Sequence, residues 1–219
     1  MGLTAAYVAG FATYIAFLVF ERYLPFQTHV AYGIRILTVA AVTLIFSRKV
    51  ISLRCSHPLG SILLGIAVCV IWVGPDFLWP SYRQHGLFQN PLTGSATSSI
   101  DPALKSNTAF IAMRITGSAL LVPIIEELFW RAWLMRVFID TNFSKIPLGA
   151  YSAQSFWLVA LLFASEHGPY WEVGLLAGIA YNWWMIRTRS LGDCILAHAV
   201  TNAGLAVWVL KADQWQYWL

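Results

Sequence analysis

One apolar segment of the sequence, Pro123-Ile-Ile-Glu-Glu-Leu-Phe-Trp-Arg-Ala-Trp-Leu-Met-Arg136, contains two glutamates and an arginine in its interior. A charged side chain in the middle of a bilayer is costly, so it usually has a partner and a function. If the segment is helical, Glu127 and Arg131 are one turn apart and can form an ion pair. Buried pairs of this kind more often support structure than catalysis, so we assign the pair a supporting role. Glu126 then points about 100° away and is left to act with another part of the chain.

The composition around this segment is that of an integral membrane protein. Of the 219 residues, 58% are hydrophobic and 11% are charged, and the mean hydropathy is +0.64. Typical soluble domains contain about 25% charged residues. The net charge of +4 does not indicate nucleic-acid binding, because the basic residues are scattered at the ends of hydrophobic segments. The bilayer, rather than a nucleic acid, is therefore the expected partner.

Long apolar runs predict an all-α, polytopic membrane bundle with about seven transmembrane helices, since a span needs about 20 apolar residues. The runs fall near residues 3–22, 30–47, 58–76, 107–138, 150–167, 171–187 and 191–210. The fourth run is about 30 residues long, more than one upright span requires. We expect a long helix there that is strongly tilted, or kinked near Pro123, where a backbone donor is missing.

The chain divides into three parts by hydrophobicity. Residues 1–106 contain the amino-terminal spans and a long loop, residues 107–210 form a helical core, and residues 211–219 form a short aromatic tail. Turn-forming residues dominate the loop at 77–106, and the sequence leaves open whether the loop lies on the membrane surface or covers an entrance.

Basic residues are distributed unevenly between the two sides of this arrangement. Four lie on one side, namely Arg22, Arg83, Lys105 and Lys211. Seven lie on the other, namely Arg48, Lys49, Arg54, Arg136, Lys145, Arg187 and Arg189. The positive-inside bias therefore favours an inside amino terminus, and we expect a multi-pass protein of the bacterial inner (plasma) membrane.

Two further segments carry polar residues at helical spacing. His167 ends the fifth run, and Phe163 lies one turn before it, so the aromatic ring can pack beneath the imidazole. His198 and Asn202 are spaced i,i+4 in the seventh run and can both donate hydrogen bonds to one oxygen atom. Each group alone has a structural interpretation as a polar contact between helices. Together with an unpaired Glu126 they exceed what helix packing requires.

The three polar groups, taken in order along successive hydrophobic segments, resemble the three motifs of a known family of membrane proteins. The motifs are Glu126-Glu127-x-x-x-Arg131, Phe163-x-x-x-His167 and His198-x-x-x-Asn202. The family is the CPBP family of intramembrane proteases, which includes CAAX prenyl endopeptidases, bacteriocin-processing proteases and Abi-like proteins. The resemblance covers about residues 107–210 and marks this part as the catalytic core.

The resemblance implies an intramembrane endopeptidase that hydrolyses a peptide bond of a membrane-associated protein or peptide. Glu126 would act as the general base on a water that His167 also holds. His198 and Asn202 would donate hydrogen bonds to the tetrahedral oxyanion, a contribution of about 3–4 kcal/mol per donor in hydrolases. The sequence does not identify the substrate, its prenylation, or the oligomeric state of the enzyme.

This mechanism requires no cofactor, and zinc is the alternative. Two histidines and one or two glutamates are suitable zinc ligands, with a water in the open position. The HExxH pattern, which places two histidines on one helix, is missing. A nucleophilic serine is not favoured, because no serine lies in a G-x-S-x-G elbow, and we interpret Cys194 as a core residue.

Two non-enzymatic functions compete with the protease hypothesis. One is a membrane scaffold or immunity-type protein, which would keep the polar cluster as structure and has no need of an unpaired Glu126. The other is a proton-coupled transporter, because glutamates and histidines in spans also serve as proton relays. The two halves of the sequence contain no inverted repeat, which makes a transporter the weaker alternative.

Overall fold

The computed structural model describes residues 2–218, and over this range the chain is helical with no β-strand. The main helices outside the fourth run are α1 (Leu3–Phe20), α2 (Thr28–Ser47), α3 (Pro58–Leu78), α7 (Ala153–Ser165), α8 (Trp171–Thr188) and α9 (Leu191–Ala212). Short 3-10 turns lie at Glu21–Tyr23, Tyr82–Gln84, Pro102–Leu104, Phe143–Lys145, Gly168–Tyr170 and Trp215–Tyr217. The predicted all-α class is confirmed.

The fourth run forms one continuous helical stretch, Thr108–Val137, of 30 residues. It consists of α4 (Thr108–Thr116), α5 (Val122–Glu127) and α6 (Met135–Val137), joined by π-helical stretches at Gly117–Leu121 and Leu128–Leu134. The irregularity that we predicted near Pro123 is therefore a widening of the helix and not a break. A proline ring clashes with the carbonyl four residues earlier, and a wider turn before it relieves that clash.

Each of the seven predicted runs coincides with a helical segment, but the segments differ in their fitness to cross a membrane. Within the described residues, five are long and apolar enough by length and composition, the fourth-run stretch among them. The other two are α7, which has 13 residues, and α8. Helix α8 is less apolar because it contains Glu172, Asn182 and Arg187.

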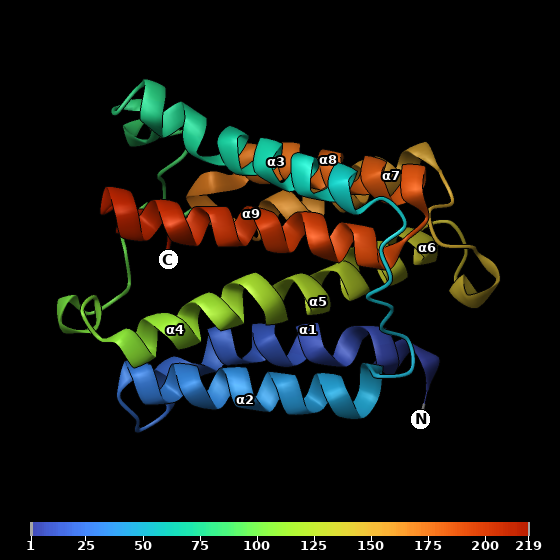
Figure 1. Cartoon of the computed structure of the whole chain (residues 1–219), viewed down its shortest axis with the longest axis horizontal. Helices are drawn as coiled ribbons and strands as arrows, with labels where there is room; N and C mark the ends of the chain where they lie inside the picture. Colours follow the sequence, from blue (N-terminus) through green and yellow to red (C-terminus); the bar gives the residue numbers. More distant parts are fainter. Residues whose placement is uncertain (1, 219) are drawn as a thin grey trace.

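Successive long helices run in opposite directions, so the chain connections gather at two ends (Figure 1). The amino terminus and the connections α2–α3, α6–α7 and α8–α9 lie at one end. The long connection between α3 and α4 lies at the other end, together with the end of α9. Helix α3 packs along α9, α1 packs along α2, and α7 packs along α8.

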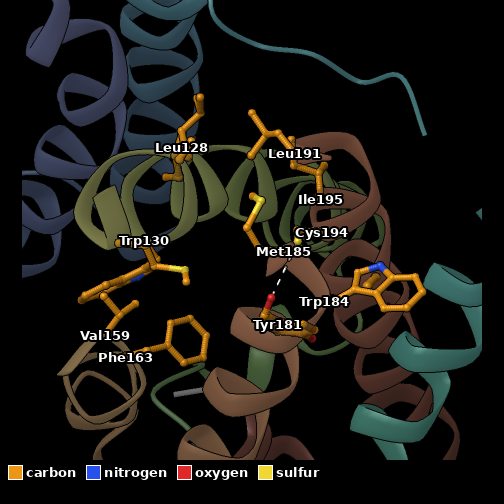
Figure 2. Packing of buried hydrophobic residues seen from close by; sticks show 14 of the residues in the cluster. Leu128, Trp130, Val159, Phe163, Tyr181, Trp184, Met185, Leu191, Cys194 and Ile195 are labelled. Atoms are coloured by element: carbon orange, nitrogen blue, oxygen red, sulfur yellow. Dashed lines mark hydrogen bonds between the residues drawn. The ribbon is translucent and has the colours of Figure 1, made fainter. Parts of the chain in front are cut away.

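The core lies where the long fourth stretch meets α7, α8 and α9 (Figure 2). Trp130 faces Phe163 of α7, with their ring centres 5.9 Å apart. Tyr181 of α8 lies beside Cys194 of α9, whose thiol approaches the Tyr181 carbonyl at 3.8 Å. Cys194 is fully buried, as the sequence predicted for a core residue. Close packing and interhelical hydrogen bonds, rather than a hydrophobic driving force, hold such a core together in lipid.

The outward faces of the bundle are rich in large apolar side chains. Leu37, Leu44 and Val70 are 73%, 64% and 61% exposed, and many other large apolar side chains are also exposed. A soluble protein rarely exposes contiguous apolar patches of this kind. Lipid is the environment that accommodates these faces.

Candidate active site

Glu127 lies at the end of α5, between the two π-helical stretches, and its side chain is fully buried. Arg131 Nη1 donates to Glu127 Oε1 at 3.2 Å, so the predicted i,i+4 ion pair is present. The Arg131 guanidinium also lies 4.3 Å from the centre of the Phe163 ring. The pair thus links the long helix to α7, in addition to neutralising two buried charges.

His198 of α9 approaches the same carboxylate, a contact that the sequence did not predict. Its Nδ1 lies 2.9 Å from Glu127 Oε1, and its ring stacks on Tyr181 at 5.2 Å. The Tyr181 hydroxyl donates to Thr201 Oγ1 at 2.7 Å, which in turn donates to the Gly65 carbonyl of α3 at 2.9 Å. Because a carboxylate only accepts, Nδ1 of His198 carries a proton and the ring orientation is fixed.

Glu126 has a different environment from its neighbour. It is 7% exposed and forms no ion pair among the residues that the structure describes, whereas Glu127 pairs with Arg131 and His198. The Oε2 atom of each glutamate has no hydrogen-bond partner in the described part of the chain. It lines a cavity of about 530 Å³, whereas Glu127 does not. His167, His198 and Asn202 line the same cavity. The four residues that we predicted to be catalytic therefore meet in one space, and the predicted supporting pair lies behind its wall.

His167 follows the end of α7, immediately after the α7 C-cap residue Glu166. Its ring contacts the Phe163 ring at 4.7 Å, as predicted, and its Nδ1 lies 2.7 Å from the Phe163 carbonyl oxygen. A carbonyl only accepts, so Nδ1 donates and the other ring nitrogen, Nε2, is an acceptor in the neutral ring. Gly174 of α8 makes room for this ring, since a Cβ there would lie 3.1 Å from His167 Cγ.

Asn202 is held by a backbone carbonyl that Pro123 leaves without a donor. In the first π-helical stretch the Val122 amide donates to the Gly117 carbonyl, five residues earlier. The same pattern would pair residue 123 with the Ser118 carbonyl, but proline has no amide hydrogen. Asn202 Nδ2 donates to that carbonyl at 2.8 Å instead. One amide hydrogen of Asn202 is thus engaged, and the second remains for another acceptor.

Glu166 is a cavity residue that the sequence interpretation missed. It lines the cavity beside His167, and its Oε1 accepts a hydrogen bond from Trp130 Nε1 at 3.1 Å. Trp130 lies one turn after Glu126 on the long helix, so this bond holds a second carboxylate close to Glu126. The available signal was an acidic residue directly before His167 in an apolar run.

The sequence left open whether the long loop at residues 77–106 lies on the membrane surface or covers an entrance. In the structure this loop covers one side of the cavity. Thr93, Ser95 and Ser98 are among its residues in the lining. Arg83 anchors the loop by pairing with Asp76 at 2.9 Å and with Glu172 of α8 at 2.7 Å.

The aromatic tail also contributes to the cavity wall. Trp218 is buried and lines the cavity, and its carbonyl accepts from Ser98 Oγ at 3.3 Å. Trp215 is buried as well, against Trp218. The tail, which follows α9, is therefore packed onto the loop and the cavity.

The zinc hypothesis requires that the histidine and glutamate side chains lie close enough together to bind one metal ion. Among residues 2–218, no group of three or more histidine, cysteine, aspartate or glutamate side chains is arranged to hold a metal ion. Glu126, His167 and His198, the ligands proposed for zinc, share the cavity but do not form such a group.

Comparison with known families gives one match, in the part of the chain that contains these residues. Residues 108–204 match the family model described as "Type II CAAX prenyl endopeptidase Rce1-like". The matched region runs from α4 into α9 and contains the predicted catalytic residues Glu126, His167, His198 and Asn202 together with the supporting pair Glu127 and Arg131. No curated protein and no solved structure matches the chain significantly.

Proposed function

We propose that this chain, whose residues 108–204 match the type II CAAX prenyl endopeptidase Rce1-like family, is an intramembrane endopeptidase that uses a glutamate-activated water. Its five long apolar helices and this family make it an integral membrane protein. The substrate is a membrane-associated protein or peptide, whose scissile bond enters the cavity beside α5. The end of the bundle that contains the seven basic residues faces the cytoplasm, and the membrane is the bacterial inner membrane.

In the proposed first step, a water lies between Glu126 and His167. His167 Nε2 accepts one hydrogen bond from this water and orients it, because Nδ1 is engaged with the Phe163 carbonyl. Glu126 takes the other proton as the water oxygen attacks the carbonyl carbon of the peptide. Glu126 then passes this proton to the amide nitrogen as the C–N bond breaks, leaving a new carboxyl end and a new amine.

In the same step, Asn202 and His198 stabilise the oxyanion. Asn202 donates the amide hydrogen that is not used by the Ser118 carbonyl. His198 donates from Nε2, which requires the protonated ring because Nδ1 already donates to Glu127. Glu127 stabilises this imidazolium and is itself held by Arg131. Each oriented donor contributes about 3–4 kcal/mol to transition-state stabilisation.

The single observation that carries the proposal is the buried Glu126 carboxylate, which has an oxygen without a protein partner in a cavity shared with both histidines and Asn202. Glu126 forms no ion pair among the described residues, and burial of a carboxylate without a countercharge is unfavourable, so a purely structural site would not retain it. A scaffold or immunity-type protein gives no reason for this arrangement.

The direct test is cleavage of a fluorogenic CAAX-type peptide, with a prenylated cysteine four residues from its carboxyl end, by the purified protein in lipid vesicles. Glu126→Gln should lower turnover about a thousandfold while the protein remains folded. Asp140→Asn makes the same chemical change at an exposed site at the other end of the bundle and should leave turnover unchanged. Cleavage by Glu126→Gln at the wild-type rate would refute the assignment.

We propose that no metal takes part, and the same assay tests this. Exhaustive chelation followed by elemental analysis should give metal-free protein with full turnover. Turnover that is lost on chelation and restored by zinc would instead place zinc between Glu126 and the two histidines.

A further inference from the structure

A second cavity lies at the opposite end of the bundle from the long loop. Its volume is about 220 Å³, and its lining includes residues from the start of α1, the α2–α3 connection and the junction of α8 with α9. Figure 1 shows these three segments at the same end of the bundle. Arg54, Arg189 and Ser190 are among its polar lining residues, and Tyr7 and Leu148 are among its apolar ones. The cavity therefore combines two guanidinium groups with an apolar wall, and the proposed peptidase mechanism uses none of these residues.

The positive charge of this cavity is not neutralised by the protein. Among the residues that the structure describes, no salt bridge involves Arg54 or Arg189, and both are exposed. The nearby acid is Asp193, whose fully buried carboxylate is occupied by the backbone amides of Ser56 and His57. This end also contains most of the excess of basic residues found in the sequence.

Arg189 has an unusual backbone conformation at the end of α8. Arg189 caps the end of α8 in the left-handed conformation, with φ of 54°. Glycine is the usual residue at such a position, because a side chain there costs conformational energy. Gly149 packs against it, since a Cβ on Gly149 would lie 2.9 Å from Arg189 Cγ.

Arg54 is held in place by the start of α9. Ser190 Oγ donates to the Arg54 carbonyl at 3.1 Å, and Ser190 Oγ also accepts from the Asp193 amide as the N-cap of α9. Gly192 allows this close approach, because a Cβ there would collide with the Arg54 backbone. The backbone of Arg54 is thus held beside Ser190, which directly follows Arg189 in the chain.

We propose that this cavity binds the phosphate of an anionic phospholipid headgroup. Guanidinium groups match phosphate oxygens in geometry and charge, and basic pockets between membrane helices bind such headgroups. The apolar wall at Tyr7 and Leu148 suits the glycerol and upper acyl region of a lipid, which a free phosphate ion would leave uncovered. The expected ligand is therefore an anionic phosphate ester that is attached to an apolar lipid.

The test measures binding of phosphatidylglycerol to the full chain in a neutral detergent, by native mass spectrometry and by the shift in unfolding temperature. Phosphatidylcholine serves as the neutral comparison. The double variant Arg54→Gln/Arg189→Gln should bind phosphatidylglycerol at least about tenfold more weakly, because two charge-assisted hydrogen-bonding groups are lost. The double variant Arg48→Gln/Lys49→Gln removes the same charge from the same end, outside the cavity, and should bind within about threefold of wild type. An equal loss in both double variants would overturn the proposal in favour of general surface attraction.

Arg189→Gly separates loss of binding from loss of folding. Without lipid this variant should unfold at the wild-type temperature or higher, because the left-handed strain is removed. With phosphatidylglycerol its stabilisation should be smaller than that of wild type; an undiminished response would contradict the proposal. The last comparison uses inorganic phosphate with the wild-type protein. If inorganic phosphate raises the unfolding temperature as much as phosphatidylglycerol does, the cavity binds a soluble anion instead. None of these readouts depends on peptidase activity.

Discussion

Two buried carboxylates in different regions of the molecule have opposite environments. Asp193, at the start of α9, accepts hydrogen bonds from the Ser56 amide at 3.0 Å, the His57 amide at 2.9 Å and Ser61 Oγ at 3.1 Å. Glu126, in the middle of the long helix, has an oxygen with no partner among the described residues. Asp193 even has a histidine and a serine beside it, the residue types of a hydrolase site. The difference teaches that the partners a carboxylate has, rather than its residue type, separate a structural carboxylate from a reactive one.

Glu127 belongs with Asp193 in this comparison because its Oε1 is held by Arg131 and His198, although its Oε2, like that of Glu126, has no partner among the described residues. It should be the more costly to remove. Glu127→Ala leaves Arg131 buried without its carboxylate, and we expect a loss of about 3–5 kcal/mol in unfolding free energy. Unfolding in mixed detergent measures this loss. The double variant Glu127→Leu/Arg131→Met should recover the stability, because no buried charge is left, but not the peptidase activity, because His198 lacks its partner. Recovery of both would show that Glu127 only neutralises Arg131.

Asp193→Asn should lower the unfolding free energy by about 1.5–3 kcal/mol, since an amide nitrogen then faces the Ser56 amide and one charged hydrogen bond is lost. Turnover per folded molecule should not change. This outcome is checked by measuring stability and turnover on the same preparation. If the Asp193→Asn protein stays stable but loses turnover, Asp193 takes part in the reaction and is not a structural carboxylate.

Part of this comparison could be predicted from the sequence. Apolar runs gave the helical segments, and i,i+4 spacing gave the Glu127–Arg131 pair, because both depend on neighbours along one helix. The contact between Glu127 and His198 joins residues 71 apart, and no local period encodes it. Glu166 was missed because its role depends on Trp130 of another helix. Pro123 signalled an irregular helix, but not that Asn202 would take over the released carbonyl.

Pro123→Ala tests whether the missing amide hydrogen positions Asn202. The new amide can donate to the Ser118 carbonyl and compete with Asn202 Nδ2, so we expect turnover to fall about tenfold without loss of stability. The control is a double-mutant cycle with Asn202→Ala, in which Pro123→Ala should add little. A full additional tenfold loss in the Asn202→Ala background would contradict the coupling.

Gly174→Ala should give the smallest effect. The added methyl group lies 3.1 Å from His167 Cγ and Nδ1, so the ring must shift by a few tenths of an ångström, and we expect turnover to fall about threefold. Gly74→Ala on α3 is the matched control, because a Cβ there meets nothing within 4 Å. Equal effects of the two substitutions on turnover would remove the evidence that His167 is positioned by Gly174.

The central claim is that Glu126 performs the chemistry and is not needed to bind the substrate. The most direct measurement is the mass of a photo-crosslinkable CAAX-type peptide recovered on the Glu126→Gln protein after incubation in vesicles. The predicted result is an intact peptide attached to residues that line the cavity, whereas the wild-type protein releases two fragments. Recovery of cleaved peptide from Glu126→Gln would contradict the claim.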